Sequence, residues 1–520
     1  MQRPTLLMDA LSLRTSDAIA IVVYLTAILA MGYYFSRRMK STEEYFLGGR
    51  SFPGWAIGLS MLGSNVSSIT FLALPAAAFS GDWQLNTQNC ALPAAALLAI
   101  WFIIPFFRRA GLTSAFEYLE DRYGPIARLY AAISFIIFQI ARAAMILYLI
   151  AIPSRDLFGL PIELILIIGG TFIGLYTILG GIEAVIWTDV IQTIVLLLGG
   201  ILCVVTVVLS LDGGMTEILQ VGVDNSKFDI GSTEWDWEKR NVFVLLLLGF
   251  NIYLGNFCAD QTVIQRYAAS ASTREARKAT GIWAVMSLPT WYFFMFLGTC
   301  LFVYYESFPD PAVETMVSGK EVERILPYFI LSQIPAGVAG IVLAAVLAAA
   351  MSSLDSIVNA TATVTIIDIV KRYFTQDRSD AYYLTMARWL SALYTAVVIL
   401  CAIWFVHIPK ENVADLSLII VAIFSGCVSA MFLLGFFTTR VDYKSVIVAM
   451  LIAIAVNFYL MLDNFGALPK SLSLGIYSYY TSVIVNIVFA ICAYTIACFR
   501  GKPKQQLDRL TVWTMDVRKD

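Results

Sequence analysis

Long apolar runs follow one another along almost the entire chain, and each is long enough to cross a bilayer. A helix rises about 1.5 Å per residue, so roughly 20 apolar residues span a hydrocarbon layer about 30 Å thick. Hydrophobic residues make up 59% of the 520 and charged residues only 14%, which excludes an ordinary water-soluble protein. The sequence predicts an all-α integral membrane protein with about 13 transmembrane helices. The predicted spans lie at about 18–35, 53–80, 88–107, 125–152, 162–180, 184–211, 241–266, 279–305, 335–370, 381–407, 413–438, 444–463 and 474–499.

The loops between these spans differ in charge, and the difference predicts how the chain is oriented. Lys and Arg residues gather in the cytoplasmic loops of membrane proteins. Most of the 35 Lys and Arg residues fall in loops that share one side with the C-terminal tail, so we expect the N-terminus outside and the C-terminus in the cytoplasm. The basic residues assigned to the cytoplasm include Arg108, Arg109, Arg266, Arg274, Arg277, Lys278, Lys371 and Arg372.

One charged residue, Arg142, lies in the middle of the span at 125–152. A guanidinium group stays protonated there, and its burial is costly unless it faces a cavity or a partner. Two interpretations are open. Arg142 either anchors an anionic ligand or holds helices together, by capping backbone carbonyls or by pairing with a buried carboxylate such as Asp189.

The span at 53–80 is interrupted by small polar residues. Between Gly58 and Thr70 it reads G-L-S-M-L-G-S-N-V-S-S-I-T, in which hydroxyl groups compete with the backbone for hydrogen bonds. An unwound helix at this depth survives only where it lines a cavity, and its freed carbonyls can then bind a cation or a substrate. The alternative is close helix packing through small residues, for which Asn65 is a poor choice.

A second interrupted span, at 241–266, lies five spans further on, and this spacing predicts an inverted repeat of five plus five helices. Its interruptions are Gly249, Asn251, Gly255, Asn256 and Asp260. The predicted organisation is an extra N-terminal helix at 1–40, a first repeat at 50–211, a second repeat at 240–440, and two further helices with a tail at 441–520.

The span at 335–370 gathers oxygen ligands at bilayer depth. Ser352, Ser353, Asp355 and Ser356 lie within little more than one helical turn, and hard cations such as Na⁺ bind several oxygen ligands at short range. A buried Asp355 is costly without a compensating charge, and Asp189 is a second carboxylate of the same kind. No G-x-x-x-x-G-K-[ST] motif occurs, so the energy for transport would come from an ion gradient, unless the protein is a channel.

Five motifs occur in a fixed order along the chain: E-E-Y-F-L-G-G-R at 43–50, T-S-A-F-E-Y-L-E-D-R-Y at 113–123, G-G-I-E-A-V-I-W-T-D-V-I-Q at 180–192, D-Q-T-V-I-Q-R-Y at 260–267 and A-A-A-M-S-S-L-D-S at 348–356. Together they resemble the sodium/solute symporter family, which has the LeuT-like inverted-repeat fold. Within that family the chain is most similar to the bacterial sodium/sialic acid symporters, and the similarity extends over about residues 15–500.

The resemblance implies a substrate site at the interrupted helix. It places a carboxylate-binding arginine at Arg142 and an inner aromatic gate at Phe250. The chain departs from these relatives in having Asn65 where they have threonine and Asn89, beside Gln88, where they have glutamine. The implied substrate-binding residues are Asn65, Ser67, Thr70, Gln88, Asn89, Arg142 and Phe250.

The same resemblance implies one or two Na⁺ ions. The first site would use the carbonyl groups of Gly63, Val66 and Ala349 and the hydroxyl groups of Ser352 and Ser353. The second would use Asp189, Ser352, Asp355 and Ser356, with Asp355 where those relatives have serine. An added carboxylate there would either bind Na⁺ more strongly or take a proton.

Together these features predict a monomeric, alternating-access symporter in a bacterial inner membrane, with no enzymatic activity and no nucleic-acid partner. It would import a small organic solute with Na⁺, and a carboxylated sugar such as sialic acid fits Arg142 best. A neutral sugar would leave Arg142 without a counter-ion, and a short monocarboxylate would leave Asn65, Ser67 and Asn89 with little to bind. A sodium channel or a ligand sensor is the alternative from a different class.

Overall fold

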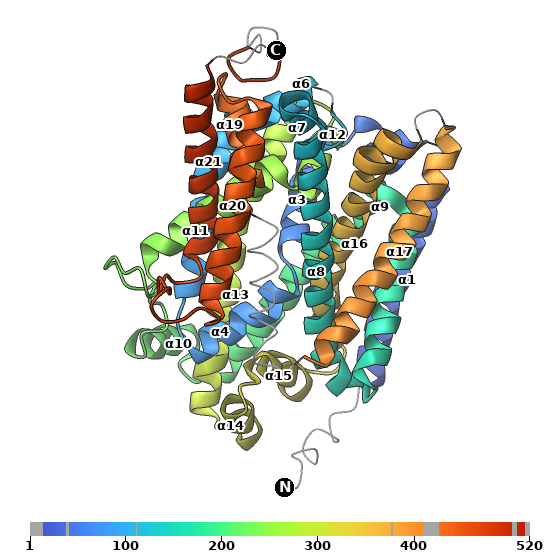
Figure 1. The fold of residues 1–520 in the computed structure, drawn as a ribbon. Helices are drawn as coiled ribbons and strands as arrows, with labels where there is room; N and C mark the ends of the chain where they lie inside the picture. The colour runs from blue at the N-terminus through green and yellow to red at the C-terminus, as the bar shows by residue number, and fades with distance from the viewer. Residues whose placement is uncertain are drawn as a thin grey trace.

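The computed structural model describes residues 14–37, 41–110, 112–375, 378–408, 426–501 and 507–514. These residues form a bundle of long helices that run roughly alongside one another, with shorter helices at both ends (Figure 1). Within them β structure is limited to one isolated bridge between Phe52 and Ser270. The predicted all-α fold class is confirmed.

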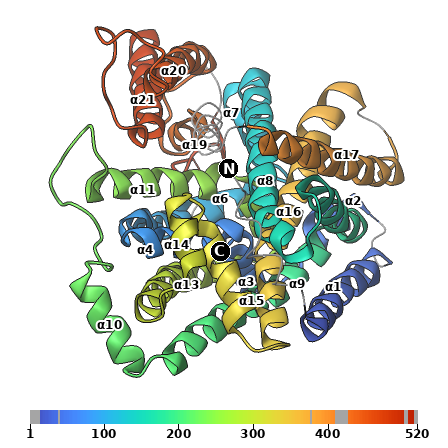
Figure 2. The ribbon, with the colours of Figure 1, turned by 90° about the horizontal axis from the view of Figure 1, so that it is seen from below.

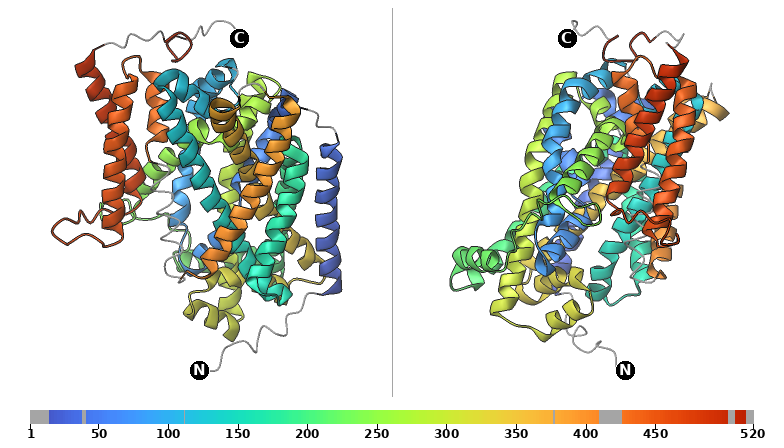
Figure 3. Two further views of the ribbon diagram at one scale, coloured as in Figure 1. Left: turned by 45° about the vertical axis from the view of Figure 1, so that its right-hand side comes forward. Right: turned by 60° about the vertical axis from the view of Figure 1, so that its left-hand side comes forward.

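The first half of the chain begins with a long outer helix and then a broken one. Figure 3 shows this first helix (blue) and the last two (orange-red) on opposite flanks of the bundle. The elements are α1 (Thr15–Ser36), α2 (Thr42–Leu47), α3 (Gly54–Asn65), η2 (Ile69–Ala73), α4 (Leu74–Ser80), η3 (Gln84–Ala91), α5 (Leu92–Leu98), α6 (Ile104–Ala110), α7 (Ala115–Tyr123), α8 (Pro125–Phe158), α9 (Ile162–Ser210) and α10 (Gly214–Asp224).

The second half repeats the pattern of a broken helix followed by long ones. Seen from below, α8, α16 and α3 lie near the centre of the bundle and α1 and α17 at its edge (Figure 2). The elements are α11 (Val242–Ala259), α12 (Gln261–Ala269), α13 (Thr273–Ser307), α14 (Pro311–Ser318), α15 (Ile325–Gln333), α16 (Val338–Val364) with its continuation η6 (Thr365–Phe374), α17 (Asp380–Val406), α19 (Val428–Phe437), α20 (Tyr443–Asn464) and α21 (Tyr480–Arg500).

Ten helices of the described chain are long and apolar enough to cross a membrane, and the bent α3–α4 pair is an eleventh candidate. The spans predicted at 162–180 and 413–438 coincide with shorter apolar helices, Ile162–Ile178 and Val428–Phe437. Residues 409–425 lie outside the described chain. The count of 13 spans therefore stays a prediction, as do the repeat boundaries.

The two predicted interruptions have different outcomes. Between α3 and α4 the axis bends by 61°, which confirms the first. In the second, the helix α11 runs unbroken through Gly249 and Asn256 and ends only at Asp260. Gly249 serves close packing instead, because a side chain there would collide with the carbonyl group of Gln88. The predicted break is confirmed at Asp260, and it was wrong at Gly249, Asn251, Gly255 and Asn256.

The helix α16 forms the centre of the core. Nearly all of its side chains are buried, and it packs most extensively against α9. The helix α9 contains two predicted spans joined at Gly181, whose φ of 53° is readily adopted by glycine. The side chains predicted to bind cations thus lie on two of the best-packed elements of the bundle, α16 and α9, and the predicted Gly63 carbonyl lies on α3.

Candidate functional site

The bend between α3 and α4 is stabilised by side chains that replace lost helical hydrogen bonds. The amide of Asn65 donates to the Met61 carbonyl oxygen at 2.9 Å, and the Ser67 hydroxyl accepts from the backbone N–H of Ile69 at 3.2 Å. Val66 at the break has φ −89° and ψ 91°, outside the helical region. Local hydrogen bonding by small polar residues therefore explains why the helix unwinds here.

One cavity brings together six of the seven predicted substrate residues: Asn65, Ser67, Thr70, Gln88, Asn89 and Arg142. Phe250 is not among its lining residues and packs, half-buried, against the hydrophobic core. The cavity also reaches Asn251, Asn256 and Asp260 on the second broken helix, which the sequence marked only as interruptions.

Arg142 projects from α8 into this cavity, with 27% of its side chain exposed. Its nearest carboxylate is Asp260, with Nη1 and Oδ2 3.9 Å apart, too far for a hydrogen bond. Within the described chain the guanidinium group of Arg142 donates no hydrogen bond. Asp189 is paired with Arg266, so the prediction of Asp189 as the partner of Arg142 was wrong.

Asn89 is held in place by its neighbours. Its amide donates to the Asn86 side-chain oxygen, and its own oxygen accepts a hydrogen bond from the Tyr253 hydroxyl. This chain of contacts connects η3 to α11. Asn89 therefore presents a fixed amide edge to the cavity.

The residues predicted for the first cation site meet between α3 and α16. The Ser352 hydroxyl donates to the Gly63 carbonyl oxygen at 2.9 Å and lies 3.3 Å from that of Ala349. The Ser353 hydroxyl donates to the neighbouring Ser64 carbonyl at 2.9 Å, and Val66 is where α3 ends. Carbonyl and hydroxyl oxygens are the ligands that hard cations prefer, so this donor set fits Na⁺.

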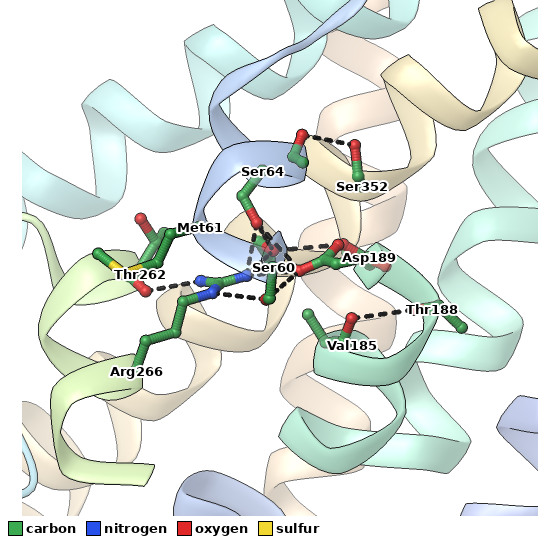
Figure 4. Close-up of polar contacts among 12 residues, drawn as sticks. Ser60, Met61, Ser64, Val185, Thr188, Asp189, Thr262, Arg266 and Ser352 are labelled. Carbon is green, nitrogen blue, oxygen red and sulfur yellow. Dashed lines mark hydrogen bonds and ion pairs between the residues drawn. The ribbon is translucent and has the colours of Figure 1, made fainter. Parts of the chain in front are cut away.

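Two of the residues predicted for the second cation site, Asp189 and Ser356, contact an arginine that is expected from the sequence in a cytoplasmic loop. Arg266 on α12 has only 2% of its side chain exposed, and its Nη2 lies 2.7 Å from Asp189 Oδ2 (Figure 4). The same guanidinium donates to the hydroxyl groups of Ser60, Ser64 and Ser356. The surface prediction for Arg266 was wrong, because a carboxylate from a distant helix compensates its charge in the interior.

Asp355 does not contact Arg266 directly. Its Oδ2 accepts a hydrogen bond from the Tyr176 hydroxyl at 3.0 Å, and its Oδ1 lies 3.4 Å from the Ser356 hydroxyl. Tyr176 comes from α9 and is fully buried. Asp189 and Ser356 thus share Arg266, Ser352 belongs to the first site, and Asp355 is connected to Arg266 only through the Ser356 hydroxyl.

Comparisons with known proteins agree with this geometry. The model of the sodium:solute symporter family matches residues 45–453. The chain belongs to this family. It is 35% identical to the sodium/sialic acid symporter NanT of Aliivibrio fischeri, over 86% of this chain and 88% of that protein. It is 36% identical to the sodium/sialic acid symporter SiaT of Proteus mirabilis, over 83% of this chain and 86% of that protein.

A solved structure supports the fold and the ion. It is described as the substrate-bound outward-open state of a Na⁺-coupled sialic acid symporter with a novel Na⁺ site. It matches with a TM-score of 0.86 and 31% identity, over 95% of this chain and all of that one. The protein is therefore a sodium-coupled transporter of the LeuT-like fold, and sodium is its coupled ion.

A network of charged residues connects α7, α8 and η6 in this sodium:solute symporter. Arg128 on α8 pairs with Asp368 and with Glu120, each at 2.7 Å, and Arg372 pairs with Glu120 at 2.7 Å. Burial would raise the pKa of Glu120, but the hydrogen bonds from Arg372 and Arg128 outweigh it and lower that pKa. This network ties α7 and α8 to the end of α16.

Proposed function

We propose that this symporter imports a sialic acid or a closely similar carboxylated sugar together with Na⁺. The observation that carries the proposal is the guanidinium group of Arg142, which faces a polar cavity and donates no hydrogen bond within the described chain. A planar guanidinium binds a carboxylate through two parallel hydrogen bonds. The names of the relatives at 35% and 36% identity support the same substrate class.

The remaining polar groups suit the rest of such a molecule. Ser67 and Thr70 offer hydroxyl groups, and Asn65, Gln88 and Asn89 offer amides, to the hydroxyl and acetamido groups of the sugar. A short monocarboxylate would leave most of these groups unused. A neutral sugar would leave Arg142 facing only Asp260 at 3.9 Å.

The first cation site would couple the ion to the transport cycle. Na⁺ bound by Gly63, Ala349 and Ser352 would hold α3 to α16, and thereby fix the bend that lines the cavity. An ion changes the balance of conformations only through contacts that differ between them. We propose that these contacts exist in the arrangement seen here and are lost when α3 moves away from α16.

The orientation and assembly belong to the same proposal. The N-terminus would lie outside and the C-terminus in the cytoplasm of a bacterial inner membrane, with one chain sufficient for transport. The cavity is lined by Asp463 and Tyr477 at the α20–α21 connection, which would then face the exterior. The arrangement would be open to the outside.

The test is uptake by the purified full-length protein in proteoliposomes with an imposed Na⁺ gradient. Labelled N-acetylneuraminic acid, a neutral hexose and a short monocarboxylate are compared. Arg142→Ala is expected to weaken uptake of the acid by 100-fold or more, because roughly 1.5–3 kcal/mol is lost for each charge-assisted hydrogen bond. Na⁺-dependent thermal stabilisation should persist.

Arg155, exposed near the end of the same helix, provides the matched control, and Arg155→Ala should leave uptake unchanged. Uptake of hexose but of no acid would refute the proposed substrate class. Sodium current without any substrate would indicate a channel, and ligand binding without uptake would indicate a sensor.

A further inference from the structure

Asp260 and Arg142 face the same cavity from different elements, and one ligand could contact both of them from the cavity side. Arg142 belongs to α8, while Asp260 is the single residue between α11 and α12. Their closest atoms are 3.9 Å apart, and the exposed fractions of their side chains are 27% and 11%. Both charged groups therefore keep unused hydrogen-bonding capacity inside the cavity.

The two oxygens of Asp260 have different surroundings. Oδ1 caps α12, accepting hydrogen bonds from the Thr262 backbone N–H at 2.8 Å and the Thr262 hydroxyl at 2.7 Å. Within the described chain, the contacts to Oδ2 are Gln139 Nε2 at 3.5 Å and Arg142 at 3.9 Å. The N-terminus of a helix also favours a negative charge at this position. Oδ2 is thus a hydrogen-bond acceptor beside the carboxylate anchor.

This geometry limits which acids can bind. A carboxylate held by Arg142 would lie close to the Asp260 carboxylate, and two like charges at short range repel. A hydroxyl group on the carbon that carries the substrate carboxylate offsets part of this repulsion, because its O–H can donate to Oδ2. A hydrogen bond to an ionised acceptor is stronger than one between neutral groups.

Resting on the proposed function, we infer that Asp260 selects sugar acids that carry a free hydroxyl group on the same carbon as the carboxylate. Free sialic acids have this arrangement at their anomeric carbon. Their glycosides and 2-deoxy analogues keep the carboxylate but lack the O–H. The symporter would therefore take up the released acid and reject the same acid in glycosidic linkage.

Competition against labelled N-acetylneuraminic acid in proteoliposomes tests this inference on the full-length protein. The competitors are unlabelled N-acetylneuraminic acid, its 2-deoxy analogue and both anomers of its 2-O-methyl glycoside. The 2-deoxy analogue removes the donor without adding bulk. We expect it and both glycosides to compete at least about tenfold more weakly than the free acid, the effect of losing one hydrogen bond to a charged group.

The variant Asp260→Asn changes the acceptor and keeps the helix cap, since Asn caps helices as well as Asp does. Its oxygen would keep the bonds from Thr262, so its NH₂ group would replace Oδ2 in the cavity. Affinity for the free acid should fall about tenfold, and its advantage over the 2-deoxy analogue should shrink to about twofold or less. Thr262→Val is the matched control: it removes one cap bond, leaves Oδ2 in place and should retain the full discrimination.

Three results would overturn the inference. The wild type could accept the 2-deoxy analogue as well as the free acid, Asp260→Asn could weaken all ligands equally, or Thr262→Val could lose the discrimination too. In the last two cases Asp260 would serve only as a cap. If Asp260→Asn does not fold, the comparison of ligands on the wild type decides. Failure of the proposed function is a different result, since no acid would then be taken up with Na⁺.

Discussion

Replacing Arg266 by methionine should destabilise the protein more than any surface substitution, because it leaves the Asp189 carboxylate uncompensated in the interior. Asp189 has no exposed side-chain surface, and Arg266 is its ion-pair partner at 2.7 Å. Removing one partner of a buried ion pair costs about 3–5 kcal/mol. Asp189 keeps the hydroxyl groups of Ser60 and Ser64, so the lower end of that range is expected.

A substitution of the partner Asp189 and a double variant measure the interaction energy between the two side chains. Asp189→Asn leaves Arg266 with the Thr262 carbonyl oxygen at 2.6 Å and three serine hydroxyls, and should also destabilise. In Arg266→Met/Asp189→Asn neither charge remains. The double variant should therefore be about 2–3 kcal/mol more stable than the sum of the single losses predicts.

The assay is unfolding of the purified protein in detergent, followed by tryptophan fluorescence, in buffers containing either Na⁺ or choline. Because Arg266→Met leaves Asp189 without a cation, Na⁺ should stabilise this variant more than it stabilises the wild type. Strictly additive losses, together with an unchanged response to Na⁺, would refute the view that the guanidinium compensates Asp189 in the interior.

Four further outcomes are expected. Ser352→Ala should raise the Na⁺ concentration for half-maximal uptake about five- to tenfold, since one neutral oxygen ligand is worth about 1 kcal/mol. Asp17 on α1 accepts hydrogen bonds from the backbone N–H groups of Gly337 and Gly340 at the start of α16, so Asp17→Ala should cost about 1 kcal/mol in thermal stability. The pKa of Glu120 is lowered in the folded state, so its ionised side chain stabilises the protein above its ordinary pKa of 4.5. This stabilisation is lost as the pH falls through the folded pKa. The difference in Tm between wild type and Glu120→Gln should therefore shrink below about pH 4.5. Reversal-potential measurements should give two Na⁺ per acid monoanion.

Apolar run lengths and polar interruptions were sufficient to predict much of this fold. The run at 53–80 predicted both the helix and its bend, because small hydroxyl residues at bilayer depth act locally on the backbone. Within 241–266 the same reasoning succeeded at Asp260 and failed at the four earlier polar or glycine positions. There Gly249 packs against a neighbouring chain segment, and only the tertiary structure distinguishes a glycine that packs from one that breaks a helix.

Site residues that lie on one helix could be predicted from the sequence, whereas ion pairs between two elements could not. Ser352 and Ser353 are consecutive residues of α16, so their closeness could be expected from the sequence. The partners of Arg142 and Arg266 could not, since each ion pair joins residues far apart in sequence. A basic residue near the end of an apolar run is normally assigned to the adjacent loop. No residue close to Arg266 in sequence indicates that Arg266 is buried and paired with Asp189.

The charges around the site explain why two cations are expected for each acid. When Asp355 is ionised, Asp189, Asp260 and Asp355 contribute three negative charges, and Arg142 and Arg266 contribute two positive ones. Buried charge is costly unless it is compensated, so this set, one negative charge in excess, favours binding of one monovalent cation. A substrate carboxylate bound by Arg142 would add one negative charge, and a second Na⁺ would compensate it. Since moving a charge through the membrane potential contributes about 2.3 kcal/mol per 100 mV, two Na⁺ with one monoanion carry one net charge inward, and the potential itself then favours accumulation of the acid.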